Sequence, residues 1–289
     1  MVIPKSESVM DRLKEIADKG FSPTTITSYI RNPIQFYFQR ILKIKEVEEV
    51  EENIAVNTLG TIIHESLKSL YDPFIGKFIS ESDLQNCIKQ IDSEVMKQFK
   101  IVYKEGEIKK GRNLLAFEVA KRNVYNFLKV ELDSIVSGDA VKIITLEQRF
   151  ERIFEHPSLP YPVKIGGSVD RIELRNGVLR IIDYKTGKVD KGTVTLTSWT
   201  DLTKDIVNEK IIQILAYAFA CEELAIDQPM EAGIISFKNL KSGFLPFTFK
   251  QGKELNTIIS KETIDQYLEQ ITILLVEILD ENIPFEEKV

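Results

Sequence analysis

Residues 167–185 read GSVDRIELRNGVLRIIDYK, and this stretch decides the fold of the chain. The pair Asn176-Gly177 is a strong signal for a two-residue type I′ turn, because both central positions of that turn need a positive φ. Aliphatic and β-branched residues lie on both sides of the pair. The stretch is therefore predicted to be a β-hairpin, and the turn sets its register so that Asp170 faces Asp183.

The predicted register places two carboxylates and a lysine on one face of the hairpin. Directly opposed side chains lie about 4.5–5.5 Å apart at Cβ, and alternation puts Lys185 on the same face, opposite Ser168. Opposed like charges at the end of an apolar face destabilise the hairpin and raise a carboxylate pKa. A hard divalent cation would compensate them, and a cation beside a lysine suits phosphodiester hydrolysis.

Two other interpretations of these residues stay open. The cluster could be an ordinary surface salt bridge at a strand end, and a bulge in either strand would break the predicted pairing. Glu147, on the preceding predicted strand, could approach the same site, although a plain strand carboxylate is the simpler interpretation.

The hydrophobic period changes from helical to strand-like near Gly138. The acidic run 45–52 is predicted to be a solvated loop. The pattern predicts an α/β fold, with a mixed central sheet flanked by helices and a large N-terminal helical portion, 1–137, integrated with a core, 138–289. The predicted helices are 8–19, 22–41 with a break at Asn32-Pro33, 58–70, 80–103, 110–136, 206–224 and 262–279, and the strands are 141–154, 163–174, 178–184, 232–237 and 244–249.

Composition limits the class of protein. The chain of 289 residues has 43% hydrophobic residues, which suffices for a substantial core, and no apolar run reaches the roughly 18 residues of a membrane span. Its two cysteines fit neither a disulfide framework nor a CxxC metal site, and we expect a cytoplasmic protein. The net charge of −6 disfavours DNA binding by the whole surface, so a DNA-binding role would need a local basic groove or a partner domain.

Motifs around the hairpin resemble those of the PD-(D/E)XK nuclease superfamily, closest to its RecB/AddB-type branch. The resemblance runs from about residue 21 to about residue 285 and implies a restriction-endonuclease-like core. The motifs follow one another in the order found in this branch, which makes the resemblance specific, although each motif alone would be weak evidence. The matching segments are Phe21-Ser22-Pro23-Thr24 to Phe38 for the opening helix, Gly60 to Glu65 for GxxxH, Gly167 to Glu173 for GxxDR, Ile181 to Lys188 for a strand ending DYKTG, and Gln213 to Tyr217 for QxxxY.

The resemblance implies a role for each matching residue. His64, Asp170 and Asp183 would bind Mg²⁺ or Mn²⁺, with the backbone carbonyl of Tyr184 as a further ligand. Lys185 would position or activate the attacking water and stabilise charge on the phosphate.

Further roles are implied around this centre. Gln213 and Tyr217, at i and i+4 on one helix face, would orient the catalytic site or the DNA backbone. Arg171, Thr186 and Lys188 would contact DNA, with simple solvation as the alternative for Arg171 and Lys188. The expected reaction is hydrolysis of DNA by metal-activated water, carried out as an exonuclease that processes DNA ends in repair or recombination.

The chain departs from the branch in its cysteines. Many AddB-type members hold an iron–sulfur cluster, but Asn32-Pro33 stands where the first cluster cysteine would precede a proline, and no cysteine follows the last predicted helix. We therefore expect no iron–sulfur cluster, with packing of Phe36, Tyr37 and Phe38 against the core in its place. Relatives are often domains of larger helicase-like proteins, so an excised domain with DNA and a helicase-like remainder or subunit as partners is expected.

Two rival functions remain. A catalytically inactive nuclease fold could serve as a DNA-binding or scaffolding module of a repair complex, although such domains typically lack the aspartate or lysine that Asp170, Asp183 and Lys185 supply here. A metal-dependent phosphohydrolase acting on small molecules is the second rival. Glycosidase chemistry fits less well, because it needs a proton-donating acid and gives Lys185 no part.

Overall fold

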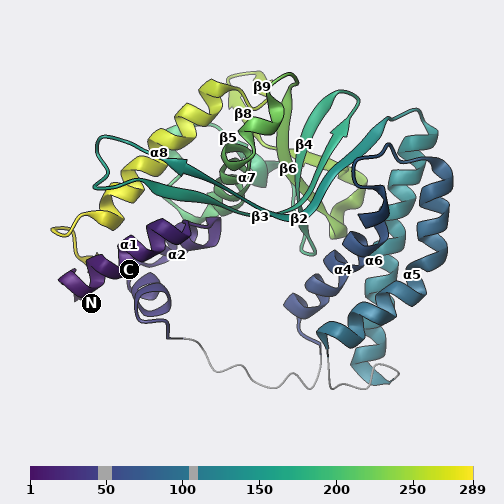
Figure 1. The fold of residues 1–289 in the computed structure, drawn as a ribbon, viewed down its shortest axis with the longest axis horizontal. Coiled ribbons are helices and arrows are strands. Elements are labelled where there is room, and N and C mark those ends of the chain that lie inside the picture. The colour runs from purple at the N-terminus through teal and green to yellow at the C-terminus, as the bar shows by residue number, and fades with distance from the viewer. Residues whose placement is uncertain (45–53, 104–109, 289) are drawn as a thin grey trace.

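A five-stranded sheet lies at the centre of the computed structural model, which describes residues 1–44, 54–103 and 110–288 (Figure 1). Its order is β2-β3-β4-β6-β7. β4 and β6 run parallel and the other neighbours run antiparallel, so the predicted mixed sheet is confirmed. The strands are β2 (Val141–Phe154), β3 (Val163–Arg175), β4 (Val178–Lys185), β6 (Met230–Ser236) and β7 (Phe244–Pro246).

One set of helices packs on the sheet through a core that includes Leu13, Ile26 and Ile172. Helix α2 begins where predicted, because the Ser22 side chain accepts a hydrogen bond from Thr25 N, and the Asn32 side chain caps the next helix. The set comprises α1 (Glu7–Lys19), α2 (Pro23–Arg31), α3 (Pro33–Phe36), a π-helical turn η1 (Tyr37–Ile41), α7 (Glu209–Ala220) and α8 (Lys261–Leu279).

A second set of helices forms a separate hydrophobic cluster with Val141, Ile182 and Tyr184. It comprises α4 (Val56–Tyr71), α5 (Glu81–Val102) and α6 (Gly111–Val136), which lie together at the right of Figure 1. The predicted capping box at the start of α5 is present between Ser80 and Asp83. The helical portion 1–137 is therefore divided, since α1 to α3 pack with α7 and α8 rather than with α4 to α6.

The first and last described segments are joined. β1 (Val2–Ile3) pairs with β10 (Phe285–Glu286), and Figure 1 shows both ends of the chain at the same corner. Phe285 packs against Tyr29, Phe36 and Tyr37, with ring centroids 5.5–6.3 Å apart. The expected packing of the aromatic segment after Pro33 is thus present, and it holds the N-terminal helices to the end of the chain.

Two predicted elements are interrupted. The predicted helix 206–224 is α-helical only in α7, because the Asp205 side chain accepts a hydrogen bond from Val207 N and starts a tight 3₁₀ turn instead. The predicted strand 244–249 is split after Pro246: Phe247 N still donates a hydrogen bond to Ala232 O on β6, and the chain then leaves the main sheet. The chain then enters a small sheet of β5 (Thr195–Leu196), β8 (Thr248–Gln251) and β9 (Glu254–Asn256).

Short 3₁₀ turns complete the fold: η2 (Asp72–Phe74), η3 (Lys191–Val194), η4 (Trp199–Asp201), η5 (Ile206–Asn208), η6 (Glu222–Ala225) and η7 (Phe237–Ser242). The predicted acidic loop 45–52 lies outside the described residues. Within the described ranges, no helix is long and apolar enough to cross a membrane.

Candidate active site

The β3–β4 hairpin has the predicted turn and register. Asn176 and Gly177 have φ values of 51° and 83°, as a type I′ turn requires. The strand pairs run from the turn to Arg171 and Ile182, so Asp170 and Asp183 are the next residues on the two strands. There the Asp170 carboxylate accepts a hydrogen bond from Tyr184 N at 2.6 Å, which ties it to the strand that carries Asp183.

Three possible metal ligands gather beside this end of the hairpin: His64 from α4, Glu147 from β2 and Asp170 from β3, with ligand atoms all within 4.8 Å of one another. His64 Nδ1 lies 3.6 Å from Glu147 Oε1 and 3.7 Å from Asp170 Oδ1. Glu147 has a φ of 47°, in the left-handed region that non-glycine residues seldom occupy. Such strain is typical of functional positions.

Negative charge dominates this group. Burial raises the pKa of Asp170 to about 7, and the nearby charges of Asp183 and Glu147 add to the increase, whereas His64 and the Tyr184 amide oppose it. Burial tends to lower the pKa of His64, but the surrounding carboxylates outweigh it and the pKa is raised. The imidazole and the carboxylate therefore both hold protons more strongly than they would in water.

Lys185 is held by two side chains. Its Nζ lies 2.8 Å from Asp183 Oδ2 and donates a hydrogen bond to Gln213 Oε1 at 3.0 Å. The Gln213 amide nitrogen donates to Asp183 Oδ1 and to the Tyr217 hydroxyl, both at 2.9 Å. The predicted residues Asp183, Lys185, Gln213 and Tyr217 therefore form one connected network, with the last two on a single face of α7.

Tyr217 explains a glycine of the sequence motif. A Cβ at Gly167 would lie 3.0 Å from Tyr217 Cε1 and 3.3 Å from Pro23 Cδ. A side chain at position 167 would therefore press on Tyr217, the residue that supports Gln213. The glycine that opens the GxxDR segment thus leaves room for the tyrosine of the QxxxY segment.

The donor set fits a divalent cation. Carboxylates are the usual ligands of hard cations, and an imidazole can complete such a site. Burial, with the charges of Asp183 and Glu147 added to it, raises the pKa of Asp170, and a bound cation would offset both effects. The group differs from the predicted ligand set, because Glu147 joins His64 and Asp170 while Asp183 is engaged with Lys185. A ligand role for Asp183 and for the Tyr184 carbonyl stays a prediction.

The opposite face of the same hairpin holds a buried ion-pair network. Arg171 is fully buried, donates to Glu131 on α6 at 2.8 Å and pairs with Glu173. Arg175 pairs with Glu131 at 2.5 Å and with Glu173 at 2.7 Å. The expectation that Arg171 contacts DNA is not met, because its guanidinium is enclosed by these partners and by Tyr71.

Two hollows flank Lys185. One, of about 430 Å³, is lined by His64, Lys185, Thr186, Lys188 and the start of α4. The other, of about 390 Å³, lies against α2 and the start of α7. Thr186 and Lys188 are thus placed beside the site, where contact with DNA stays a prediction, and Lys188 is paired with Asp190 at 3.1 Å.

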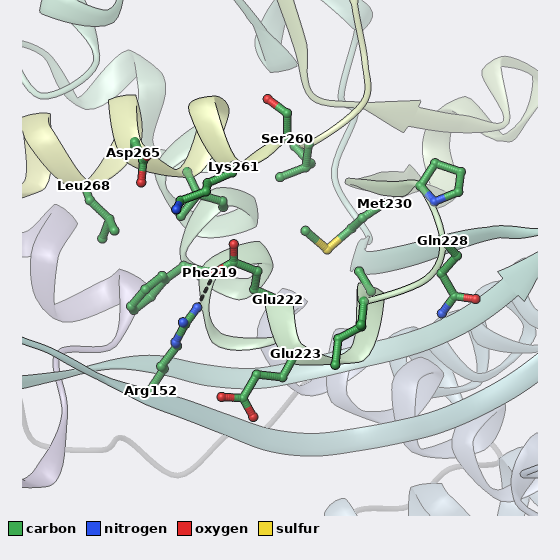
Figure 2. Close-up of a pocket in the computed structure, with 15 residues that line it drawn as sticks. Arg152, Phe219, Glu222, Glu223, Gln228, Met230, Ser260, Lys261, Asp265 and Leu268 are labelled. Atoms are coloured by element: carbon green, nitrogen blue, oxygen red, sulfur yellow. Dashed lines mark hydrogen bonds and ion pairs between the residues drawn. The ribbon is translucent and has the colours of Figure 1, made fainter.

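A further hollow of about 570 Å³ lies at the far end of α7. Figure 2 shows its lining, where Arg152 pairs with Glu222, and the Arg152 guanidinium lies 5.0 Å from the centroid of the Phe219 ring. None of the residues of the metal-ligand group or the lysine network lines it. The catalytic candidates therefore belong to the other end of α7.

Sequence reasoning missed part of the site. The sequence favours a plain strand carboxylate at Glu147, because nothing in it indicates the left-handed φ that the structure has at this residue. The cations Arg31, Arg40 and Lys210, which line the second hollow, carried no motif.

The fold and the site define a class: a mixed α/β core that presents a carboxylate–histidine group beside a fixed lysine. A family model described as the PD-(D/E)XK nuclease superfamily matches residues 20–289. The chain belongs to this superfamily, which implies metal-dependent nuclease or phosphodiesterase chemistry.

Relatives among curated proteins come from Rickettsia. An uncharacterized protein of Rickettsia bellii is 22% identical over 94% of this chain and 32% of its own length. An uncharacterized protein of Rickettsia felis is 25% identical over 58% of this chain and 19% of its own length. The chain thus spans about a third or less of the length of these relatives.

Proposed function

We propose that the chain is a Mg²⁺- or Mn²⁺-dependent deoxyribonuclease of RecB/AddB type, acting as an exonuclease on DNA ends during repair or recombination. The observation that carries the proposal is the carboxylate-rich group of His64, Glu147 and Asp170 beside a lysine fixed by Asp183 and Gln213. The motifs that resemble the RecB/AddB branch supply most of these residues, which supports the narrower assignment.

The residues divide the work of phosphodiester hydrolysis. A divalent cation, when bound, would neutralise phosphate charge and lower the pKa of water. His64 and Asp170 must each lose a proton to serve as ligands, so their raised pKa values make cation binding pH-dependent. Lys185 Nζ is held ready to stabilise charge that develops on the phosphate, and Asp183 and Gln213 fix its position.

Cleavage of four DNA substrates tests the proposal. Linear and circular forms of single- and double-stranded DNA are incubated with Mg²⁺, Mn²⁺ or EDTA, beside Asp183→Ala and Lys185→Ala. We expect metal-dependent degradation of linear DNA that both substitutions abolish. Cleavage of circular DNA would replace the exonuclease by an endonuclease, and activity that survives EDTA would contradict the metal requirement.

The inactive-module alternative makes the opposite prediction, namely binding of DNA without cleavage in any metal. The complete network of Asp183, Lys185, Gln213 and Tyr217 argues against it, because a scaffold has no need to hold a lysine at this position.

We also propose that DNA is held in part by another protein region, either a helicase-like remainder of the same protein or a partner subunit. Two facts support this: the net charge is −6, and the chain spans 32% of the Rickettsia bellii relative. Copurification of the full-length relative with helicase activity would support it, and a fully processive isolated chain would contradict it.

A further inference from the structure

The two hollows beside Lys185 share part of their lining. Lys185 and Lys210 line both of them. Their lining includes five lysines and arginines (Arg31, Arg40, Lys185, Lys188 and Lys210) and one carboxylate, Glu209. A chain with a net charge of −6 therefore carries a local excess of positive charge on either side of its catalytic lysine.

The hollow against α2 has the more specific arrangement. Arg31, at the end of α2, lies 3.1 Å from the Glu209 carboxylate, and Lys210 lies 3.2 Å from the same carboxylate. Glu209 thus sits between two cations at the first turn of α7, the helix that carries Gln213. A carboxylate shared by two cations occupies the kind of position that a phosphate oxygen could also take.

Arg40, which lines the same hollow, has an unsatisfied hydrogen-bond donor. Its Nε is buried, and none of the described residues accepts a hydrogen bond from it. Buried guanidinium nitrogens usually have a partner, because an unmade bond to a charged group is costly. Since Arg40 lines the hollow beside Lys185, an anionic ligand entering that hollow can approach its guanidinium.

We propose that this hollow binds the sugar-phosphate backbone of the DNA strand being cut, on one side of the scissile bond, with Arg31, Arg40 and Lys210 as the phosphate-binding residues. The proposal rests on the nuclease function proposed above. We call the hollow lined by Arg31, Arg40 and Lys210 the strand path. Among the described residues that line this hollow none is aromatic, so we expect it to bind the backbone rather than to stack on bases, with no dependence on the DNA sequence.

Glu209 then acts as an internal competitor. In the free protein it holds Arg31 and Lys210 in place, and a bound phosphate has to displace it from both. Substitutions along the strand path should therefore change the affinity for DNA in opposite directions. Loss of a cation weakens binding, whereas loss of the Glu209 charge strengthens it.

Binding of a fluorescein-labelled single-stranded oligonucleotide tests the path, measured by anisotropy in EDTA so that no cleavage occurs. We expect Arg31→Ala and Arg40→Ala each to weaken binding by roughly 10-fold, as for loss of a charge-assisted hydrogen bond. Each should also make the slope of log affinity against log salt concentration less negative by about 0.7, as for one lost phosphate contact. Glu209→Gln should tighten binding.

Arg122→Ala is the matched control, since Arg122 is an exposed arginine on α6 that lines neither hollow. Unchanged affinity and salt slope in both arginine variants, with binding by the wild type intact, would overturn the strand path. Cleavage is measured separately on the wild type and on both arginine variants. Binding that depends on Arg31 and Arg40 without any cleavage would keep the path and overturn the nuclease function, whereas cleavage unaffected by either arginine would do the reverse.

Discussion

The β3–β4 hairpin carries two buried charge clusters on its two faces, and they are built differently. On the face toward α6, Arg171 and Arg175 are matched by Glu131 and Glu173. Burial would raise the pKa of Glu131, but the two arginines outweigh it and the pKa is lowered. At the other cluster, burial and neighbouring carboxylates raise the pKa of Asp170 to about 7.

The difference separates structure from function. Buried charges that serve only the fold are paired and keep their charged forms, as in the arginine network. A buried group whose neighbours repel its charge is stable only with a proton or a cation. The cluster around Asp170 is therefore the candidate site for a bound cation, and the arginine network stabilises the strands that carry it.

The largest effect is expected from replacing Lys185, the lysine beside the cluster around Asp170. Lys185→Met should lower DNA cleavage by at least roughly 100-fold, because it removes the fixed positive charge near the phosphate. It should leave folding intact, since the lysine is partly exposed. Initial rates on labelled DNA with Mn²⁺ provide the measurement, with Lys253→Met, an exposed lysine in the β8–β9 turn, as the control. A loss of cleavage matched by the control would show a general charge effect instead.

Removing a carboxylate from the arginine network should lower the stability of the fold rather than the rate of cleavage. Glu131→Ala leaves two buried guanidinium groups without their shared carboxylate and should lower the free energy of unfolding by about 3–5 kcal/mol. Urea denaturation followed by circular dichroism measures the loss. An unchanged unfolding midpoint would mean that the network contributes nothing to the fold, and the contrast between the two faces would fail.

The contrast also shows what the sequence could predict. The turn at Asn176-Gly177 is a local signal, and the hairpin register followed from it alone. The enclosure of Arg171 could not be predicted, because its partner Glu131 lies 40 residues earlier on a helix whose packing is tertiary. The place of Glu147 in the metal-ligand group could not be predicted for a different reason: nothing in its neighbouring residues indicates a left-handed backbone.

The cations of the strand path form a third case. Arg31 and Arg40 lie on the N-terminal helical segments, and they meet Lys210 only because α2 packs against α7. Motif matching identified the candidate residues of the lysine network, because each motif lies within a short stretch of sequence. It did not identify the proposed strand path, because its cations come from segments that are distant in the sequence.

A smaller effect is expected from pH and metal. In EDTA, Asp170 holds its proton more strongly in the folded protein than in the unfolded chain, with a pKa of about 7 against an ordinary 3.8. The stability this contributes at low pH is lost as pH rises through 7, and the raised pKa of His64 acts in the same direction. Asp170→Asn should therefore raise the Tm at pH 8 by about 2–4 °C, the equivalent of about 1 kcal/mol.

Added Mg²⁺ or Mn²⁺ should remove that difference for the wild type. The cation replaces the protons, so its stabilising effect on the wild type should be larger at pH 8 than at pH 6 and weaker in Asp170→Asn. Thermal denaturation at both pH values, with EDTA or metal, gives the comparison. A wild type that is more stable at pH 8 than at pH 6 in EDTA would show that Asp170 and His64 do not govern this range.

The smallest effect is expected from the support of the lysine network. Tyr217→Phe removes the hydroxyl that accepts a hydrogen bond from Gln213, while Gln213 keeps its bonds to Asp183 and Lys185. One neutral hydrogen bond is worth about 1 kcal/mol, so kcat should fall by roughly 5-fold with little change in KM. Gln213→Ala should cost more, because it releases Lys185 as well. Equal losses in the two variants would mean that Tyr217 acts on the substrate directly, and a loss confined to KM would place it on the DNA backbone instead of behind the lysine.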